Sequence, residues 1–220
     1  MTKSFQLSLT ADIATIKAHN VICVTGTDTG IGKTVVTGLL AKELASQGTV
    51  VTQKWVQSGD LDSPDISTHD TISNLNYDQK YNDDRQVYSF NDPVSPHLAA
   101  RLENQTIEPE LLKSATHRLA DTFDTVLVET SGGIMVPLSE SVTTGDLVAD
   151  MKLPTIVVVP NKLGTINHSL LTMQYLTQHK VPIIGFIINQ FDVKQSQLHA
   201  DNPKIIHAIS NQVCIGVCSA

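Results

Sequence analysis

Short apolar runs recur along the chain, and several of the longer segments between them carry apolar residues every three or four positions. The runs are rich in Val and Ile and nearly continuous in apolar character, which is typical of strands that are covered on both faces. Such strands occur in parallel sheets flanked by helices. The predicted strands are residues 21–25, 50–56, 125–129, 155–159, 183–189 and 213–217.

Helical periodicity fills three of the intervals between these strands. The predicted helices span residues 34–47, 108–122 and 166–179, and residues 58–81 predict a loop followed by a helix. In the first helix Val36, Leu40 and Leu44 fall on one face, and Gly48 is a suitable C-terminal stop. Strands that alternate with helices predict an α/β fold: a doubly wound, mostly parallel sheet with helices on both faces.

Composition narrows the class of protein. The chain has 220 residues, 41% of them hydrophobic, and a formal net charge of −7. This length suits a single domain with a sizeable core. The acidic balance argues against a nucleic-acid partner or an anionic membrane, and no apolar run approaches the roughly 20 residues that span a bilayer. Three cysteines are too few for a disulfide framework, so we expect reduced thiols and a cytoplasmic location.

The most specific local signal is a glycine-rich loop between the first strand and the first helix. Residues 26–34 read Gly-Thr-Asp-Thr-Gly-Ile-Gly-Lys-Thr. Backbone N–H groups of such a loop bind phosphate, Lys33 adds a positive charge, and the Thr34 hydroxyl can reach a magnesium ion. Five residues separate Gly26 from Gly32, where the common phosphate loop has four. The segment therefore predicts a variant of the P-loop NTPase phosphate loop.

Further polar residues lie near the ends of predicted strands. Ligands of parallel α/β sheets bind beyond the carboxyl ends of the strands, so we expect these residues to share one site with the loop. Glu129 ends an apolar strand, where a carboxylate is costly unless it is paired or metal-bound. Lys54 is suited to stabilising a transferring phosphoryl group. Thr29 and Ser58 offer hydroxyls to a small polar substrate, although such groups also bond loop backbone.

The start of a predicted helix, at residues 164–168, is the last candidate binding site. The free N–H groups near Gly164 and Thr165 can bind a carboxylate, and Asn167 can add a side-chain donor. An ordinary helix cap is the alternative reading of the same residues.

The loop and several other segments resemble dethiobiotin synthetase, an enzyme family of biotin synthesis. Residues 162–168, Lys-Leu-Gly-Thr-Ile-Asn-His, closely resemble one family string. Residues 54–59 resemble the family's Lys-Pro-x-x-Ser-Gly with Trp in place of Pro, and residues 128–133 resemble its Val-Glu-Gly-Ala-Gly-Gly with two substitutions. Ser-Pro-His at residues 95–97 and an Asn at position 189 extend the match over most of the chain.

This resemblance implies a reaction in which 7,8-diaminononanoate, CO2 and ATP give dethiobiotin, ADP and phosphate. It implies Mg²⁺ as the metal and a homodimer in which Asn167 reaches the partner's site. It also implies that Asn189 contacts adenine. Because the family usually begins near the first strand, residues 1–20 are expected to be an N-terminal extension of a single domain at residues 21–220.

The implied residue roles form four sets. The catalytic residues are Lys33, Lys54, Thr29 and Ser58. The nucleotide contacts are Thr27, Asp28, Gly30, Ile31, Gly32, Lys33, Thr34 and Asn189. The substrate contacts are Ser58, Gly164, Thr165 and Asn167. The metal ligands are Thr34, Asp65 and Glu129, with Asp60, Asp62 and Asp70 as rivals of Asp65 because the loop length is not fixed.

Two departures from the family pattern keep alternatives open. Gly30 stands where some members have Glu, and Thr130-Ser131 replaces a Gly-Ala pair. A catalytically impaired homologue is therefore one alternative. A nucleotide-switch ATPase of the partitioning type is another, although Asp28 occupies the position where that class has lysine.

Overall fold

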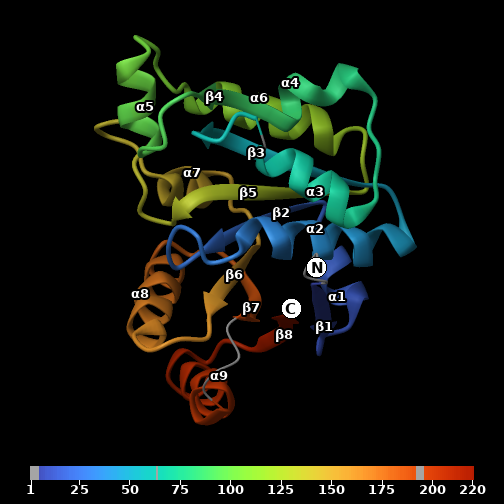
Figure 1. The fold of residues 1–220 in the computed structure, drawn as a ribbon, viewed down its shortest axis with the longest axis vertical. Coiled ribbons are helices and arrows are strands. Elements are labelled where there is room, and N and C mark those ends of the chain that lie inside the picture. The colour runs from blue at the N-terminus through green and yellow to red at the C-terminus, as the bar shows by residue number, and fades with distance from the viewer. Residues whose placement is uncertain (1–4, 63, 192–195) are drawn as a thin grey trace.

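The computed structural model describes residues 5–62, 64–191 and 196–220, and it contains one eight-stranded sheet (Figure 1). The strand order is β1-β8-β7-β6-β2-β5-β3-β4, with β2 to β8 parallel and β1 antiparallel to β8. The strands are β1 Gln6–Leu9, β2 Val21–Gly26, β3 Val50–Ser58, β4 Gln86–Phe90, β5 Thr125–Gly133, β6 Thr155–Pro160, β7 Ile183–Gln190 and β8 Cys214–Ser219. The predicted fold class is confirmed.

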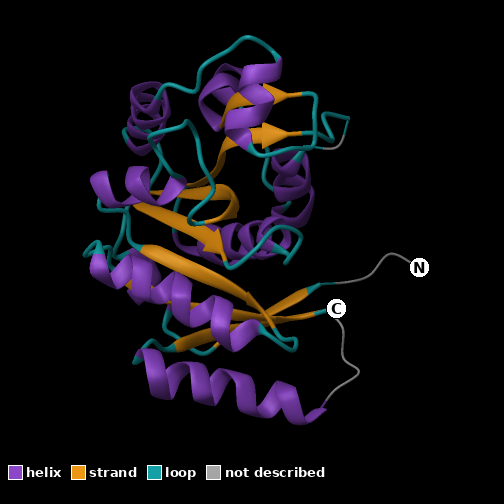
Figure 2. Cartoon of the chain, turned by 90° about the vertical axis from the view of Figure 1, so that its left-hand side faces the viewer, coloured by secondary structure: helices purple, strands orange, loops and turns teal. Residues whose placement is uncertain are grey.

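Helices flank both faces of this sheet (Figure 2). They are α1 Ile13–Lys17, α2 Lys33–Leu44, α3 Asp65–Ser73, α4 Asn82–Arg85, α5 Pro96–Leu102, α6 Pro109–Ala120, α7 Thr144–Asp150, α8 Thr165–Gln178 and α9 Ser196–Ser210, with short 3₁₀ helices at Ala45–Gln47 and Gln79–Tyr81. Two apolar clusters form the core: one joins α1 and α2 to the sheet, and the other joins α6, α7 and α8 to it. None of the helices in the described ranges is long and apolar enough to cross a membrane.

Each strand expected from the sequence forms, but some edge elements were not foreseen. Strands β1 and β4 lie at the two edges of the sheet, and the exposure along β1 alternates instead of staying apolar. Edge strands bury fewer residues, so their sequences carry a weaker hydrophobic signal. Within the expected N-terminal extension, β1 pairs with β8 and α1 packs against α2, so this segment completes the sheet.

The register of the central strands places the expected site. Glu129 on β5 pairs with Val24 of β2 and with Lys54 of β3. Strand β5 continues to Gly133, beyond the predicted end at Glu129, so Glu129 lies within the strand and not at its end. The loop that follows β2 therefore begins next to a buried Lys–Glu pair.

Candidate active site

The phosphate loop connects Gly26 at the end of β2 to Lys33 at the start of α2. Gly32 has a φ of +91°, in the left-handed region that favours glycine. A Cβ at this position would lie 2.2 Å from Asn189 Nδ2 and 2.8 Å from Phe191 Cε2. Backbone conformation and the close approach of β7 both require glycine here.

Lys33 is buried beneath this loop, with 5% of its surface exposed. Its Nζ donates a hydrogen bond to the backbone oxygen of Asp28 at 2.8 Å. Burial lowers the pKa of Lys33 to about 8, while the carboxylate of Glu129 opposes that change. The loop therefore holds a poorly solvated ammonium group where an anion would be stabilised.

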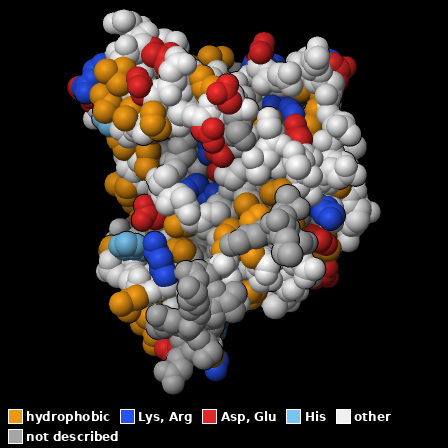
Figure 3. All heavy atoms as spheres, viewed as in Figure 1, with side chains coloured by type: hydrophobic (Ala, Val, Ile, Leu, Met, Phe, Trp, Pro, Cys, Tyr) orange, Lys and Arg blue, Asp and Glu red, His pale blue; other side chains and the backbone are white. Residues whose placement is uncertain are grey.

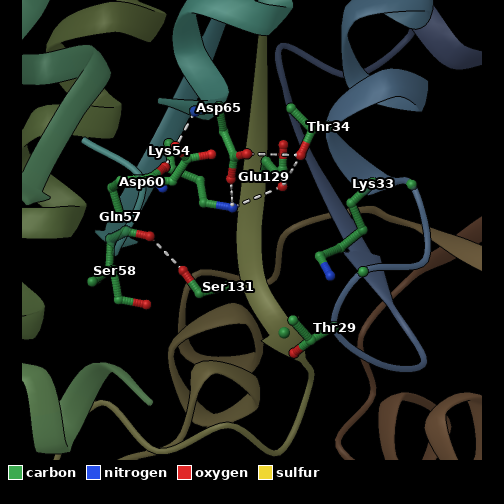
Figure 4. A pocket seen from close by; sticks show the side chains of 14 residues that line it. Thr29, Lys33, Thr34, Lys54, Gln57, Ser58, Asp60, Asp65, Glu129 and Ser131 are labelled. Atoms are coloured by element: carbon green, nitrogen blue, oxygen red, sulfur yellow. Dashed lines mark hydrogen bonds and ion pairs between the residues drawn. The ribbon is translucent and has the colours of Figure 1, made fainter. Parts of the chain in front are cut away.

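Four polar side chains meet beside the loop (Figure 4). Thr34 Oγ1, on the first turn of α2, lies 3.0 Å from Asp65 Oδ1 and 3.1 Å from Glu129 Oε1. Lys54 Nζ lies 2.5 Å from Asp65 Oδ2 and 2.7 Å from Glu129 Oε1. These four residues are far apart in the sequence. They come together because they lie on α2, β3, β5 and the start of α3.

The charges in this cluster stabilise one another. Burial alone would lower the pKa of Lys54, but Glu129 and Asp65 raise it above its usual value. Burial would raise the pKa of Glu129, but Lys54 and the hydrogen bond to His69 hold it well below its usual range. Both groups are therefore ionised at neutral pH.

The structure separates Asp65 from its rivals as a candidate metal ligand. Asp65 begins α3 and lies within hydrogen-bond distance of Thr34. Asp70, on the same helix, instead pairs with the buried Arg85 at 2.5 Å. Asp60 is exposed and lines the cavity, whereas Asp62 is exposed and does not line it.

A cavity of about 260 Å³ opens next to this cluster. Figure 3 shows a recess in this region in which basic and acidic side chains lie close together. The expected site residues along its wall are Thr29, Gly30, Gly32, Lys33, Thr34, Lys54, Ser58, Asp65 and Glu129. The hydroxyls of Thr29 and Ser58 therefore border the same space as both lysines.

The expected carboxylate site at the start of α8 lies outside that cavity. Gly164 and Asn167 are exposed, whereas Thr165 is buried, and none of the three lines the cavity. Within a single chain, the structure does not bring this helix start to the Lys–Glu cluster.

Asn189 takes part in the architecture of the phosphate loop. Its Nδ2 donates to the backbone oxygen of Ile31 at 2.6 Å, and its Oδ1 accepts from Phe191 N at 3.1 Å. The side chain therefore braces the loop. One amide hydrogen and one lone pair remain for a further partner. Nearby, the backbone N–H of Thr27 donates to Val158 O, which ties the loop to β6.

His69 is a site residue that sequence reasoning missed. It lies one turn after Asp65 on α3, is fully buried, and has its Nε2 2.6 Å from Glu129 Oε2. The i, i+4 spacing from Asp65 was a usable signal, since both side chains then share one helical face.

The two residues that replace the family's Gly-Ala pair after Glu129 make hydrogen bonds within the protein. Thr130 donates to Thr25 Oγ1, and Ser131 donates to Val56 O.

Comparisons with known proteins place this site in a family. A family model described as an AAA domain matches residues 20–217. The ATP-dependent dethiobiotin synthetase BioD 2 of Pasteurella multocida is 41% identical over 177 residues, which cover 78% of this chain and 82% of that protein. BioD 2 of Haemophilus ducreyi is 39% identical over 181 residues, covering 81% and 86%. BioD of Lysinibacillus sphaericus is 41% identical over 172 residues, covering 76% and 74%.

Solved structures of lower identity share the fold. The MinD cell division protein of Aquifex aeolicus superposes with a TM-score of 0.55 at 16% identity, covering 90% of this chain and 81% of that one. A ParA family ATPase from Chlorobium tepidum gives 0.53 at 16% identity, covering 89% and 82%. These likenesses establish the sheet architecture alone. The sequence relatives decide the family: the chain belongs to the ATP-dependent dethiobiotin synthetases.

Proposed function

We propose that this protein carboxylates 7,8-diaminononanoate with CO2 and closes the ureido ring at the expense of ATP, giving dethiobiotin, ADP and phosphate. Beyond family membership, one observation carries the proposal. A buried cluster of Lys54, Glu129, Asp65 and Thr34 borders the phosphate loop and opens onto a cavity of small-molecule size.

The reaction requires three bond-forming steps. A substrate amine attacks CO2 and loses a proton, giving a carbamate. A carbamate oxygen then attacks the γ-phosphorus of ATP, and ADP leaves, which gives a carbamic–phosphoric anhydride. The second amine attacks the carbonyl carbon, loses a proton and expels phosphate as the ring closes. This chemistry depends on positioning and charge stabilisation more than on a nucleophilic side chain.

The lysines would handle the phosphate charge. On nucleotide binding, Lys33 would exchange its bond to the Asp28 carbonyl for phosphate oxygens, together with the N–H groups of Gly30, Ile31 and Gly32. Lys54 would interact with the carbamate and with the phosphoryl group in transfer, because two carboxylates fix its ammonium at the cavity wall.

The donor set suits magnesium. Mg²⁺ favours oxygen ligands and binds through one or two carboxylates together with substrate phosphates. Next to the loop, the Thr34 hydroxyl lies within hydrogen-bond distance of both the Asp65 and the Glu129 carboxylates. Thr34, Asp65 and Glu129 would hold this ion, which would supply positive charge beside the nucleotide phosphates.

Small hydroxyls would orient the substrate. Thr29 and Ser58 border the cavity, and a Cβ at Gly30 would meet nothing within 4 Å, so the missing side chain leaves open space. For the nucleotide base, Asn189 would use the amide hydrogen and lone pair that the loop leaves free.

A homodimer would complete the site. Gly164, Thr165 and Asn167 do not line the cavity of their own chain, which supports binding of the substrate carboxylate from a partner. Two large apolar side chains near that helix are exposed: Leu163 at 86% and Leu171 at 57%. Exposed apolar groups of this kind favour association of two protomers.

A cytoplasmic location would keep the three free cysteines reduced.

One assay tests the proposal. Phosphate release and dethiobiotin formation are measured with ATP and magnesium, with and without diaminononanoate and bicarbonate. We expect product only with both co-substrates, and a loss of several orders of magnitude in Lys33→Ala, which removes a phosphate-binding charge. ATP hydrolysis that ignores both co-substrates and yields no ring product would refute the proposal and favour a nucleotide switch.

A further inference from the structure

We propose that His69 is a positioning residue that orients the Glu129 carboxylate for its magnesium ion. The inference rests on the proposed role of Glu129 as a metal ligand. His69 is buried, and it belongs to the site through a tertiary contact, not through the sequence motif of the phosphate loop.

The contact itself is short and fully enclosed. His69 has no exposed surface, Glu129 has 1%, and the distance from Nε2 to Oε2 is 2.6 Å. An ionised carboxylate can only accept hydrogen bonds, so the imidazole donates from Nε2. Among the residues that the structure describes, Nδ1 of His69 has no hydrogen-bond partner. Glu129 is therefore the polar contact that accounts for burying this side chain.

The two oxygens of Glu129 have separate tasks. Oε1 faces Thr34 and Lys54 on the cavity side, at 3.1 and 2.7 Å. Oε2 faces away from them, toward His69. The terminal torsion of a glutamate is broad, so a carboxylate held at one oxygen can still rotate. A donor on Oε2 removes that freedom and keeps Oε1 directed at the phosphate side.

Helix α3 couples this donor to the second carboxylate. Asp65 begins the helix and His69 follows one turn later, so both point to the same cluster. A glycine on α2 lets α3 come close: a Cβ at Gly38 would lie 2.9 Å from Ile72 Cβ and 3.3 Å from His69 Cα. The position of α3 therefore sets the geometry of both acidic groups together.

The energetic cost of this arrangement favours a role beyond packing. A buried imidazole nitrogen without a hydrogen-bond partner is destabilising. An apolar side chain at position 69 would avoid that cost. Hydrogen-bonding groups behind metal ligands commonly change metal affinity or activity by about 10–100-fold when they are removed. This comparison sets the size of the effect that we expect.

Two amide variants separate positioning from space filling. The side-chain nitrogen of glutamine can take the place of Nε2, whereas that of asparagine is nearest to Nδ1, which faces no partner. Magnesium-dependent binding of ADP is measured by calorimetry across a magnesium titration. We expect His69→Gln to stay within about threefold of wild type, and His69→Asn to need about 10–100-fold more magnesium. Ile72→Ala, on the same helix, is the control for lost packing and should leave the magnesium requirement unchanged.

The outcomes are decisive in either direction. Equal magnesium requirements for His69→Gln and His69→Asn would overturn the inference, as would ADP binding by wild type that does not depend on magnesium. A shift of the same size in Ile72→Ala would show that packing alone is responsible. The binding measurement needs no diaminononanoate. A wild-type protein that binds ADP with magnesium but forms no dethiobiotin would therefore refute the proposed reaction and leave the His69 comparison intact.

Discussion

Replacing Lys33 with methionine should stabilise the nucleotide-free protein near neutral pH and lose this advantage in alkali. Lys33 is 5% exposed, and its ammonium donates a hydrogen bond to the Asp28 carbonyl. Methionine has a similar length and an uncharged, flexible side chain that fills such sites. The substitution therefore removes the buried charge with little loss of packing.

The magnitude follows from the pKa of Lys33. Burial lowers it from an ordinary 10.5 to about 8. Between these values the unfolded chain holds a proton that the folded protein has released, so wild-type stability rises with pH across this window. Below about pH 8 the full penalty of about 3 kcal/mol is present, at about 1.4 kcal/mol for each pH unit between the two pKa values. From pH 7 to pH 9.5 about 2 kcal/mol of it is relieved.

Urea unfolding without nucleotide or magnesium measures this effect at both pH values, at a fixed protomer concentration. The stability advantage of Lys33→Met over wild type should shrink by about 2 kcal/mol between pH 7 and pH 9.5. Groups that do not interact with Lys33 cancel in the difference. Lys162→Met, at an exposed position, controls for the change of residue type. A Lys33→Met difference that stays constant within about 0.5 kcal/mol would refute the reasoning.

Three further predictions address the helices and carboxylates around the site. Gly38→Ala should lower the free energy of unfolding in urea by about 1–3 kcal/mol, since the added Cβ would lie 2.9 Å from an α3 side chain; an unchanged midpoint would contradict the close packing of α2 and α3. Asp65→Asn should raise the magnesium needed for half-maximal turnover at least about tenfold. Asp70→Asn, which breaks the pair with a buried arginine, should lower stability and leave that magnesium requirement unchanged, and the reverse pattern would reassign the ligand. Asn167→Ala and Lys33→Ala protomers should recover activity when mixed, because one site of the mixed dimer then carries neither change; no recovery in confirmed mixed dimers would count against the partner contribution.

The architecture could be predicted from the sequence because the strands and helices of a parallel sheet each have a local sequence pattern. Each central strand is buried on both faces and therefore reads as an apolar run, and each covering helix repeats its apolar face with its own period. The phosphate loop was visible for the same reason. Its glycines meet a backbone requirement within a few residues, as the φ of +91° at Gly32 illustrates. The parallel pairing of β3 with β5 then placed Lys54 beside Glu129.

What only the tertiary structure decided depends on contacts between distant residues. The sequence favoured Asp65 and left three rival aspartates, and the packing of α3 against α2 brings Asp65 to Thr34 while Asp70 pairs with Arg85. The bond between His69 and Glu129 joins residues 60 positions apart, and although the spacing of His69 from Asp65 places both on one helical face, it does not identify Glu129 as the partner. Edge strands such as β1 bury too few side chains to produce an apolar run in the sequence. Periodicity reports how a segment meets the core, whereas the pairing of individual polar groups is decided when elements dock.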